Sequence, residues 1–219
     1  MLVNQKRINK YLLENYMKTE INAQIVKKLR DETGAGMMNC KKALTENDGD
    51  YEKAIQSLKL KGMATADKKS SRNTNEGLIY SYIHTGGKLG ILLEVNCETD
   101  FVARREEFSD LAKNIAMQIA SNPDIKVVST EDIPDSLKEE VRNFENAKDD
   151  LKNKPKEIQD KIIEGRVEKS LKQSVLLEQD YIRDPGITVN DYIKQVIGII
   201  GENIRVSRFT RYVLGETES

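Results

Sequence analysis

Histidine, cysteine and tryptophan are scarce in this chain of 219 residues, which contains one histidine, two cysteines and no tryptophan. The lone histidine, His84, excludes a metal site built from several histidines and leaves no second histidine for a catalytic constellation. Cys40 and Cys97 form no C-x-x-C pair and fall on apolar faces, so we expect buried, reduced thiols and a reducing compartment. The sequence therefore predicts a protein without covalent catalysis, without a cofactor and without a metal ion.

The chain also lacks a dominant charge and a long apolar run. Its 35 basic residues nearly balance 36 acidic ones, so the net charge of −1 provides no field that attracts nucleic acid or an acidic membrane. No apolar run approaches the ~20 residues that cross a bilayer, and the start lacks the apolar region of a secretory signal. We therefore expect no direct nucleic-acid partner and no membrane, although 38% hydrophobic residues suffice for a core.

Two glycine-containing motifs match nucleotide-binding loops only in part. Gly34-Ala35-Gly36 begins a G-x-G-x-x-G pattern, but Asn39 occupies its last position, and the motif lies between predicted helices. Gly86-Gly87-Lys88 has the turn chemistry of a hairpin and lacks the spacing of a phosphate loop. Neither motif predicts a nucleotide held by this chain.

Residues 19–62 carry the pattern of three short helices. Asn22 is the N-cap of the first helix, which should end at Gly34, and the second helix presents its own apolar stripe before a glycine turn. Asp50 caps the third helix, which we expect to end at Gly62. This arrangement is typical of a compact three-helix module of the ubiquitin-associated (UBA) type.

The segments beside this module are assigned from composition. Residues 1–18 are an N-terminal extension, which we interpret as a short disordered tail, with an upstream start codon and a weak targeting segment as alternatives. Residues 63–76 are polar and basic without a sustained apolar face, so we expect a linker with marginal helix. This linker is expected to act as a hinge.

Residues 77–219 are predicted to form a core domain. Alternating apolar residues predict a hairpin of two strands and a third strand from residue 204 to about 214. Helices near Phe108 and Val189 are expected on one face of this antiparallel sheet, and near-heptad spacing predicts a helical hairpin over residues 136–177. The predicted fold class is α+β, with a UBA-like module followed by a small three-stranded sheet, its helices and the α-hairpin.

Phe101 occupies a corner between a predicted strand and a predicted helix. Residues 89–97 alternate between apolar and polar side chains, and apolar residues recur at helical spacing from Phe108 onward. Thr99 or Asp100 is placed to cap the first turn of that helix. From the residues alone, the phenyl ring is either buried in the core or projects as a wedge.

Four sequence blocks occur in the order that one protein family shows. The blocks are residues 28–30 with 33–44, residues 96–104 (NCETDFVAR), residues 154–155 with 163–166, and residues 201–204 with 208–209. Together they resemble the signatures of elongation factor Ts, the family that removes GDP from the translational GTPase elongation factor Tu. The match extends over nearly all of the chain from about Thr19. Within the family, the chain is similar to the short, single-core bacterial and plastid members.

The resemblance implies a translation elongation factor that acts as a guanine nucleotide exchange factor. Such a factor binds elongation factor Tu with GDP, displaces Mg²⁺ and promotes GDP release so that GTP can bind. Mg²⁺ demands near-ideal octahedral geometry, so a small displacement of a coordinating segment weakens nucleotide binding. No covalent step is required, because a factor that prefers the nucleotide-free GTPase expels the nucleotide by linkage.

The resemblance also assigns site residues. It implies that Thr99, Asp100, Phe101 and Val102 dislodge Mg²⁺ from elongation factor Tu, with Phe101 as the inserted wedge. It implies that the three-helix module grips the GTPase through Arg30, Met37 and Met38. Core packing is the alternative for Met37, whereas Met38 is the better contact candidate because two adjacent methionines cannot both face one small core.

The predicted hairpin turn is a further candidate contact. His84 and Gly86 are expected to reach another domain of the partner from the second subunit of a dimer, with a plain hairpin tip as the alternative. By resemblance, the partners are elongation factor Tu, both GDP-bound and nucleotide-free, and a second copy of this chain, through the sheet edge or the helix pair. The expected location is the plastid stroma, with a bacterial cytoplasm as the alternative.

Two other functional classes are alternatives to this one. In the first, the chain is a dimeric adaptor whose UBA-like module binds ubiquitin-like or other helical partners; the contiguous TDFV block argues against it. In the second, the chain binds RNA through the last predicted strand, which interleaves basic and aromatic residues. The residues concerned are Arg205, Phe209, Arg208, Arg211 and Tyr212.

Overall fold

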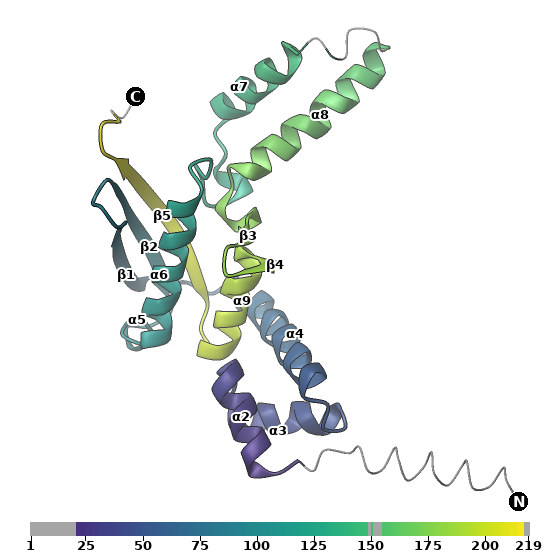
Figure 1. Cartoon of the computed structure of the whole chain (residues 1–219), viewed down its shortest axis with the longest axis vertical. Coiled ribbons are helices and arrows are strands. Elements are labelled where there is room, and N and C mark those ends of the chain that lie inside the picture. The colour runs from purple at the N-terminus through teal and green to yellow at the C-terminus, as the bar shows by residue number, and fades with distance from the viewer. Residues whose placement is uncertain (1–20, 149, 151–154, 217–219) are drawn as a thin grey trace, which may run out of the picture. The chain divides into compact units, whose positions relative to one another are not determined.

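The computed structural model describes residues 21–148, 150 and 155–216, which form two compact units (Figure 1). Within these residues, the first unit comprises residues 21–70 together with Lys194–Gly201, and the second comprises residues 71–193 and 202–216. Helices and a small antiparallel sheet confirm the α+β class. The predicted extension, residues 1–18, lies outside the described residues, and the domain boundaries stay predictions.

Three helices form the N-terminal part of the first unit, as the sequence predicts. They are α2 (Ala23–Thr33), α3 (Met37–Glu46) and α4 (Tyr51–Lys69). The Asn22 side chain accepts hydrogen bonds from two backbone N–H groups of α2, and Asp50 accepts one from Lys53 N at 3.1 Å. The buried side chains between these helices are Val26, Leu29, Cys40, Ala43, Leu44 and Ala54.

The prediction that the third helix ends at Gly62 is wrong, because α4 continues to Lys69. A single glycine in a helix costs only about 1 kcal/mol, which is too little to end it. Gly62 instead permits a close approach of α9 (Val189–Ile200), since a Cβ built at Gly198 lies 2.5 Å from Gly62 Cα. Much of the predicted linker, residues 63–76, is therefore helical.

The second unit is built on the predicted three-stranded antiparallel sheet. Its strands are β1 (Glu76–Ile83), β2 (Leu89–Cys97) and β5 (Ile204–Val213), in the order β1-β2-β5. Helix α6 (Glu106–Ser121) lies across one face, and Figure 1 shows it in front of the strands. The buried core between them contains Ile91, Leu93, Val95, Cys97, Phe108, Leu111, Ile115 and Ile119.

A two-stranded sheet that the sequence did not predict packs against α6. It pairs β3 (Asp180–Tyr181) with β4 (Asp184–Thr188). The buried Gln118 amide donates to Asp180 O at 3.1 Å and accepts from Ile182 N at 2.9 Å, so both of its polar ends are satisfied. A polar residue on an otherwise apolar helix face thus fixes this ribbon.

The predicted helical hairpin is formed by α7 (Asp135–Asn146) and α8 (Lys156–Gln173), which Figure 1 shows as an arm of the second unit. Glu145 is buried there, 2.6 Å from Lys148 Nζ and 3.8 Å from the Arg166 guanidinium. The remaining short elements are α5 (Asp100–Ala103), η1 (Thr130–Asp132) and η3 (Leu176–Glu178). Within the described residues, no helix is long and apolar enough to cross a membrane.

The close approach of Gly62 and Gly198 predicts a difference between two glycine substitutions. Gly198→Ala should lower the free energy of unfolding by about 1–3 kcal/mol, because the new methyl group overlaps the backbone of α4. Gly165→Ala on α8 is the matched control, since nothing lies within 4 Å of its added Cβ, and it should raise stability by up to about 1 kcal/mol. Urea denaturation measures both, and equal effects would contradict the close approach.

Candidate functional site

The corner after β2 is formed by Thr99, Asp100, Phe101 and Val102, and we call these residues the TDFV corner. Strand β2 ends at Cys97, and Thr99 has extended backbone angles before α5 begins at Asp100. The Thr99 hydroxyl accepts a hydrogen bond from Val102 N at 3.4 Å, so Thr99 is the N-cap of α5. Of the two predicted caps, the structure uses Thr99.

Within the TDFV corner, the two apolar side chains differ in burial. Val102 is buried, whereas the Phe101 side chain is 78% exposed. Asp100 is held by Arg104, whose guanidinium lies 2.7 Å from its carboxylate. Of the two alternatives for Phe101, the buried position is therefore excluded, and the corner presents a phenyl ring to solvent.

Two glutamates that sequence reasoning did not assign lie behind this corner. The Glu202 carboxylate accepts hydrogen bonds from Glu98 N and Thr99 N at 3.1 and 3.0 Å, and from Thr99 Oγ1 at 2.7 Å. The Glu98 carboxylate accepts from Asn203 N at 2.6 Å and lies 3.4 Å from Arg72. The only sequence signal was the family block at residues 201–204, which carried no role.

The predicted residues of the three-helix module lie on either side of the turn between α2 and α3. Gly34 adopts a left-handed conformation, with φ of 67°, and its N–H donates to Arg30 O at 2.8 Å. Arg30 is exposed at the end of α2, and Met37 and Met38 open α3 with 40% and 77% of their surface exposed. Both methionines are therefore available on the surface, Met38 more than Met37.

The predicted residues His84 and Gly86 lie at the tip of the β1–β2 hairpin. His84 Nδ1 lies 2.9 Å from the Tyr82 hydroxyl, and the turn residues are exposed. Gly86 has a φ of 93°, which only glycine adopts without strain. The tip and the TDFV corner lie at opposite ends of β2, about 30 Å apart at ~3.3 Å per strand residue.

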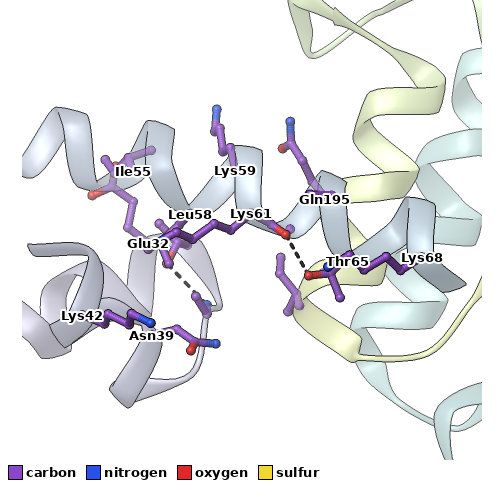
Figure 2. A pocket seen from close by; sticks show the side chains of 16 residues that line it. Glu32, Asn39, Lys42, Ile55, Leu58, Lys59, Lys61, Thr65, Lys68 and Gln195 are labelled. Carbon is purple, nitrogen blue, oxygen red and sulfur yellow. Dashed lines mark hydrogen bonds between the residues drawn. The ribbon is translucent and has the colours of Figure 1, made fainter. Parts of the chain in front are cut away.

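A groove of about 670 Å³ opens on the first unit, between α4 and the ends of its neighbours. Figure 2 shows Lys42, Lys59, Lys61 and Lys68 around it, with Glu32 as an acidic neighbour. Lys61 is engaged by Glu46. Among the described residues, no cluster of three potential metal ligands exists.

Both cysteines are buried, as predicted, and neither is in a disulfide. The Cys97 thiol donates a hydrogen bond to Thr99 O at 3.1 Å, directly beneath the TDFV corner. Burial raises the pKa of Cys97 to about 11, and the negative charge of Glu202 acts in the same direction. Burial also raises the pKa of Cys40. Both thiols are therefore protonated at neutral pH.

Comparisons with known proteins cover nearly the whole chain. The sequence model of the family described as Elongation factor TS matches residues 14–216. A relative named "Elongation factor Ts, chloroplastic" from Phaeodactylum tricornutum is 81% identical over 202 residues, which are 92% of this chain and 100% of the relative. "Elongation factor Ts" from Synechococcus elongatus is 58% identical over 197 residues, which are 90% of this chain and 89% of the relative.

The raised pKa of Cys97 predicts slow thiol chemistry. At pH 8 its thiolate fraction should be roughly one-hundredth of that of an ordinary cysteine, and burial blocks access further. Ellman's reagent should therefore titrate neither cysteine of the native protein within minutes, and both after denaturation in guanidinium. Because a raised pKa favours the thiol below about pH 11, the rate should increase with pH up to that value. Rapid labelling at pH 7 would contradict this assignment.

Proposed function

The chain belongs to the elongation factor Ts family, and from that premise we propose how its residues perform nucleotide exchange. It is a translation elongation factor with a role in guanine nucleotide exchange on elongation factor Tu. Chloroplastic and cyanobacterial relatives support the plastid stroma as its location, with a bacterial cytoplasm as the alternative. The finer assignments below rest on the exposure and geometry of particular side chains.

We propose that the TDFV corner opens the nucleotide site of elongation factor Tu, with Phe101 as the wedge. The observation that carries this proposal is an exposed phenyl ring, 78% accessible, on a corner fixed by hydrogen bonds. Burying a phenyl ring in the partner contributes about 1.5–3 kcal/mol, and each ~1.4 kcal/mol changes an equilibrium tenfold. The wedge thus favours an opened, Mg²⁺-free site but does not hold the complex alone.

Holding contacts come from the surface of the three-helix module. Arg30 supplies a charged guanidinium group whose N–H groups donate several hydrogen bonds. Met38 supplies a flexible apolar side chain that adapts to the partner's surface. Met37, which is less exposed, contributes at the edge of the same contact. The hairpin tip, with His84 and Gly86, is proposed as the second contact, delivered by the other subunit of a dimer.

Exchange by these residues needs no bond to form or break. The factor binds the GDP complex through the module, and insertion of Phe101 favours the conformation that holds Mg²⁺ and GDP poorly. Because the coupling is reciprocal, GTP binding in turn weakens the hold of the factor and releases it. A protein of this kind is an exchange factor without covalent chemistry.

The last strand offers little support for RNA binding. Arg211 donates to the backbone carbonyls of Ile119 and Asn122 at the end of α6, and Arg208 pairs with Glu94 at 2.7 Å. Two of the three strand arginines are therefore engaged within the protein.

The adaptor alternative leaves an exposed Phe101 on an ordered corner without a role.

We propose that the face of the sheet opposite α6 mediates a homodimer. Leu92 is 45% exposed at the centre of this face, where it pairs with Ser81 and Thr210. The other large exposed side chains on this face and at its end are Ile79, Ile83, Tyr212 and Leu214. These apolar side chains share the face with Ser81, Thr210 and the Glu94–Arg208 ion pair. Exposed apolar residues gathered on one face of a sheet are typical of a self-complementary interface. We prefer it to the sheet edge and the helix pair for this reason.

Phe101→Ala tests the wedge. It should slow the release of a fluorescent GDP from elongation factor Tu by about 10- to 100-fold in a stopped-flow assay, because 1.5–3 kcal/mol of burial is lost. Stability should change by less than about 0.5 kcal/mol, since the ring is exposed. Phe144→Ala is the matched control, as Phe144 is an exposed phenylalanine on α7. Unchanged release with Phe101→Ala would sink the wedge.

Leu92→Lys tests the dimer face. The new charge should convert the dimer to a monomer at micromolar concentration, because an unpaired ammonium group cannot be buried in an apolar interface. Light scattering after size exclusion measures the mass. Leu60→Lys replaces another exposed leucine, on α4, and should leave the mass unchanged. A dimeric Leu92→Lys protein would remove this face from consideration.

A further inference from the structure

We propose that Glu202 is a positioning residue for exchange, which holds the TDFV corner in the conformation that inserts Phe101 into the partner. This inference rests on the function proposed above. In this scheme Glu202 does not touch the partner. It acts through Thr99, from which its carboxylate accepts two hydrogen bonds.

The Glu202 carboxylate satisfies backbone donors where regular structure stops. Glu98 and Thr99 lie after the end of β2 and before the first turn of α5. Their N–H groups donate to one Glu202 oxygen at 3.1 and 3.0 Å. Hydrogen bonds to a charged acceptor are stronger than neutral ones, so the two peptide units are fixed relative to the carboxylate.

The Thr99 hydroxyl extends this hold to the helix that carries Phe101. It donates its proton to the second Glu202 oxygen at 2.7 Å. With its proton directed there, its lone pairs face Val102 N, at 3.4 Å. Glu202 thus sets the orientation of the cap, and the cap sets the first turn of α5.

A reciprocal contact anchors Glu202 itself. The Glu98 carboxylate accepts from Asn203 N at 2.6 Å, and the Asn203 side chain donates to Arg72 O at 2.9 Å. The Arg72 guanidinium lies 3.4 Å from Glu98 and offsets the second negative charge. Each glutamate therefore binds the backbone beside the other, although the two segments are 104 residues apart in sequence.

Because Phe101 is exposed, the anchor at Glu202 increases the rate of exchange. A buried ring would be fixed by the core, but this ring contacts solvent on most of its surface. Without the anchor, Thr99, Asp100 and Phe101, which unlike Val102 are not buried, must be ordered during insertion, and the lost conformational freedom opposes insertion. Because Glu202 orders the corner before insertion, this loss of conformational entropy does not oppose binding.

A kinetic split distinguishes positioning from docking. Glu202→Ala should lower the maximal rate of GDP release about tenfold, the effect of losing one charge-assisted hydrogen-bond group. The factor concentration that gives half the maximal rate should change less than about twofold, because the module contacts at Arg30 and Met38 are intact. Glu202→Gln keeps one acceptor oxygen and should restore part of the rate.

Asp191→Ala is the structural control in the same unit. Asp191 accepts from Thr188 N at 3.3 Å in the capping box of α9, so its loss also removes a carboxylate that caps backbone. It should leave the maximal release rate unchanged. An equal loss of rate in Asp191→Ala and Glu202→Ala would show general destabilisation and overturn the inference.

A double substitution and hydrogen exchange complete the test. If Glu202 acts through Phe101, Glu202→Ala should cause little further loss in a Phe101→Ala background, whereas additive losses would overturn the inference. In the free protein, Glu202→Ala should speed amide exchange at Glu98 and Thr99 at least tenfold, and unchanged protection would also overturn it. Normal GDP release with Phe101→Ala would contradict the proposed function itself. Slow release with Phe101→Ala but normal release with Glu202→Ala would contradict only the inference about Glu202.

Discussion

The antiparallel pairing of β2 with β5 is the constraint on which the second unit depends. It joins segments more than a hundred residues apart, with Cys97 opposite Ile204 at the end of the ladder. This register places the residues after β2 beside the residues before β5, so that Glu98 and Glu202 meet. One residue of slip would turn the alternate side chains of β2 to the other face and remove both the core and the anchor.

The residues of β2 contribute to stability, whereas the residues that follow β2 carry the proposed function. Its buried side chains pack against α6 and form the core with it, whereas between Cys97 and Phe108 the only buried residue is Val102. A large apolar ring is normally placed inside a protein, but Phe101 is outside, on a backbone that is ordered by the hydrogen bonds to Glu202 and by the burial of Val102. The unit therefore exposes its ring without weakening its core.

Local chemistry explains what the sequence could predict. The caps at Asn22 and Asp50, the strand alternation before Cys97 and the corner at Phe101 depend on neighbours within a few residues, and the structure confirms them. The anchor at Glu202 depends on a partner 104 residues away in sequence, which no periodicity reveals. The role of Thr99 to Val102 on a partner stays a proposal, carried by resemblance and exposure.

The wrong end of the third helix has a similar origin. Glycine often ends a helix, but Gly62 lies inside α4, where its missing side chain allows the close approach of Gly198 on α9. The ribbon at β3 and β4 was missed because its pairing depends on a buried amide, Gln118, on another helix. Tertiary contacts thus decided the cases in which local signals were ambiguous.

The participation of Lys194–Gly201 in the first unit has a consequence for dissecting the protein. A fragment cut after residue 70 would lack the helix that approaches Gly62, and a bare backbone groove would face water where Gly198 lies in the intact chain. The unit is discontinuous, so it cannot be transplanted as one stretch of sequence. A circularly permuted or fused version would need to carry both segments together.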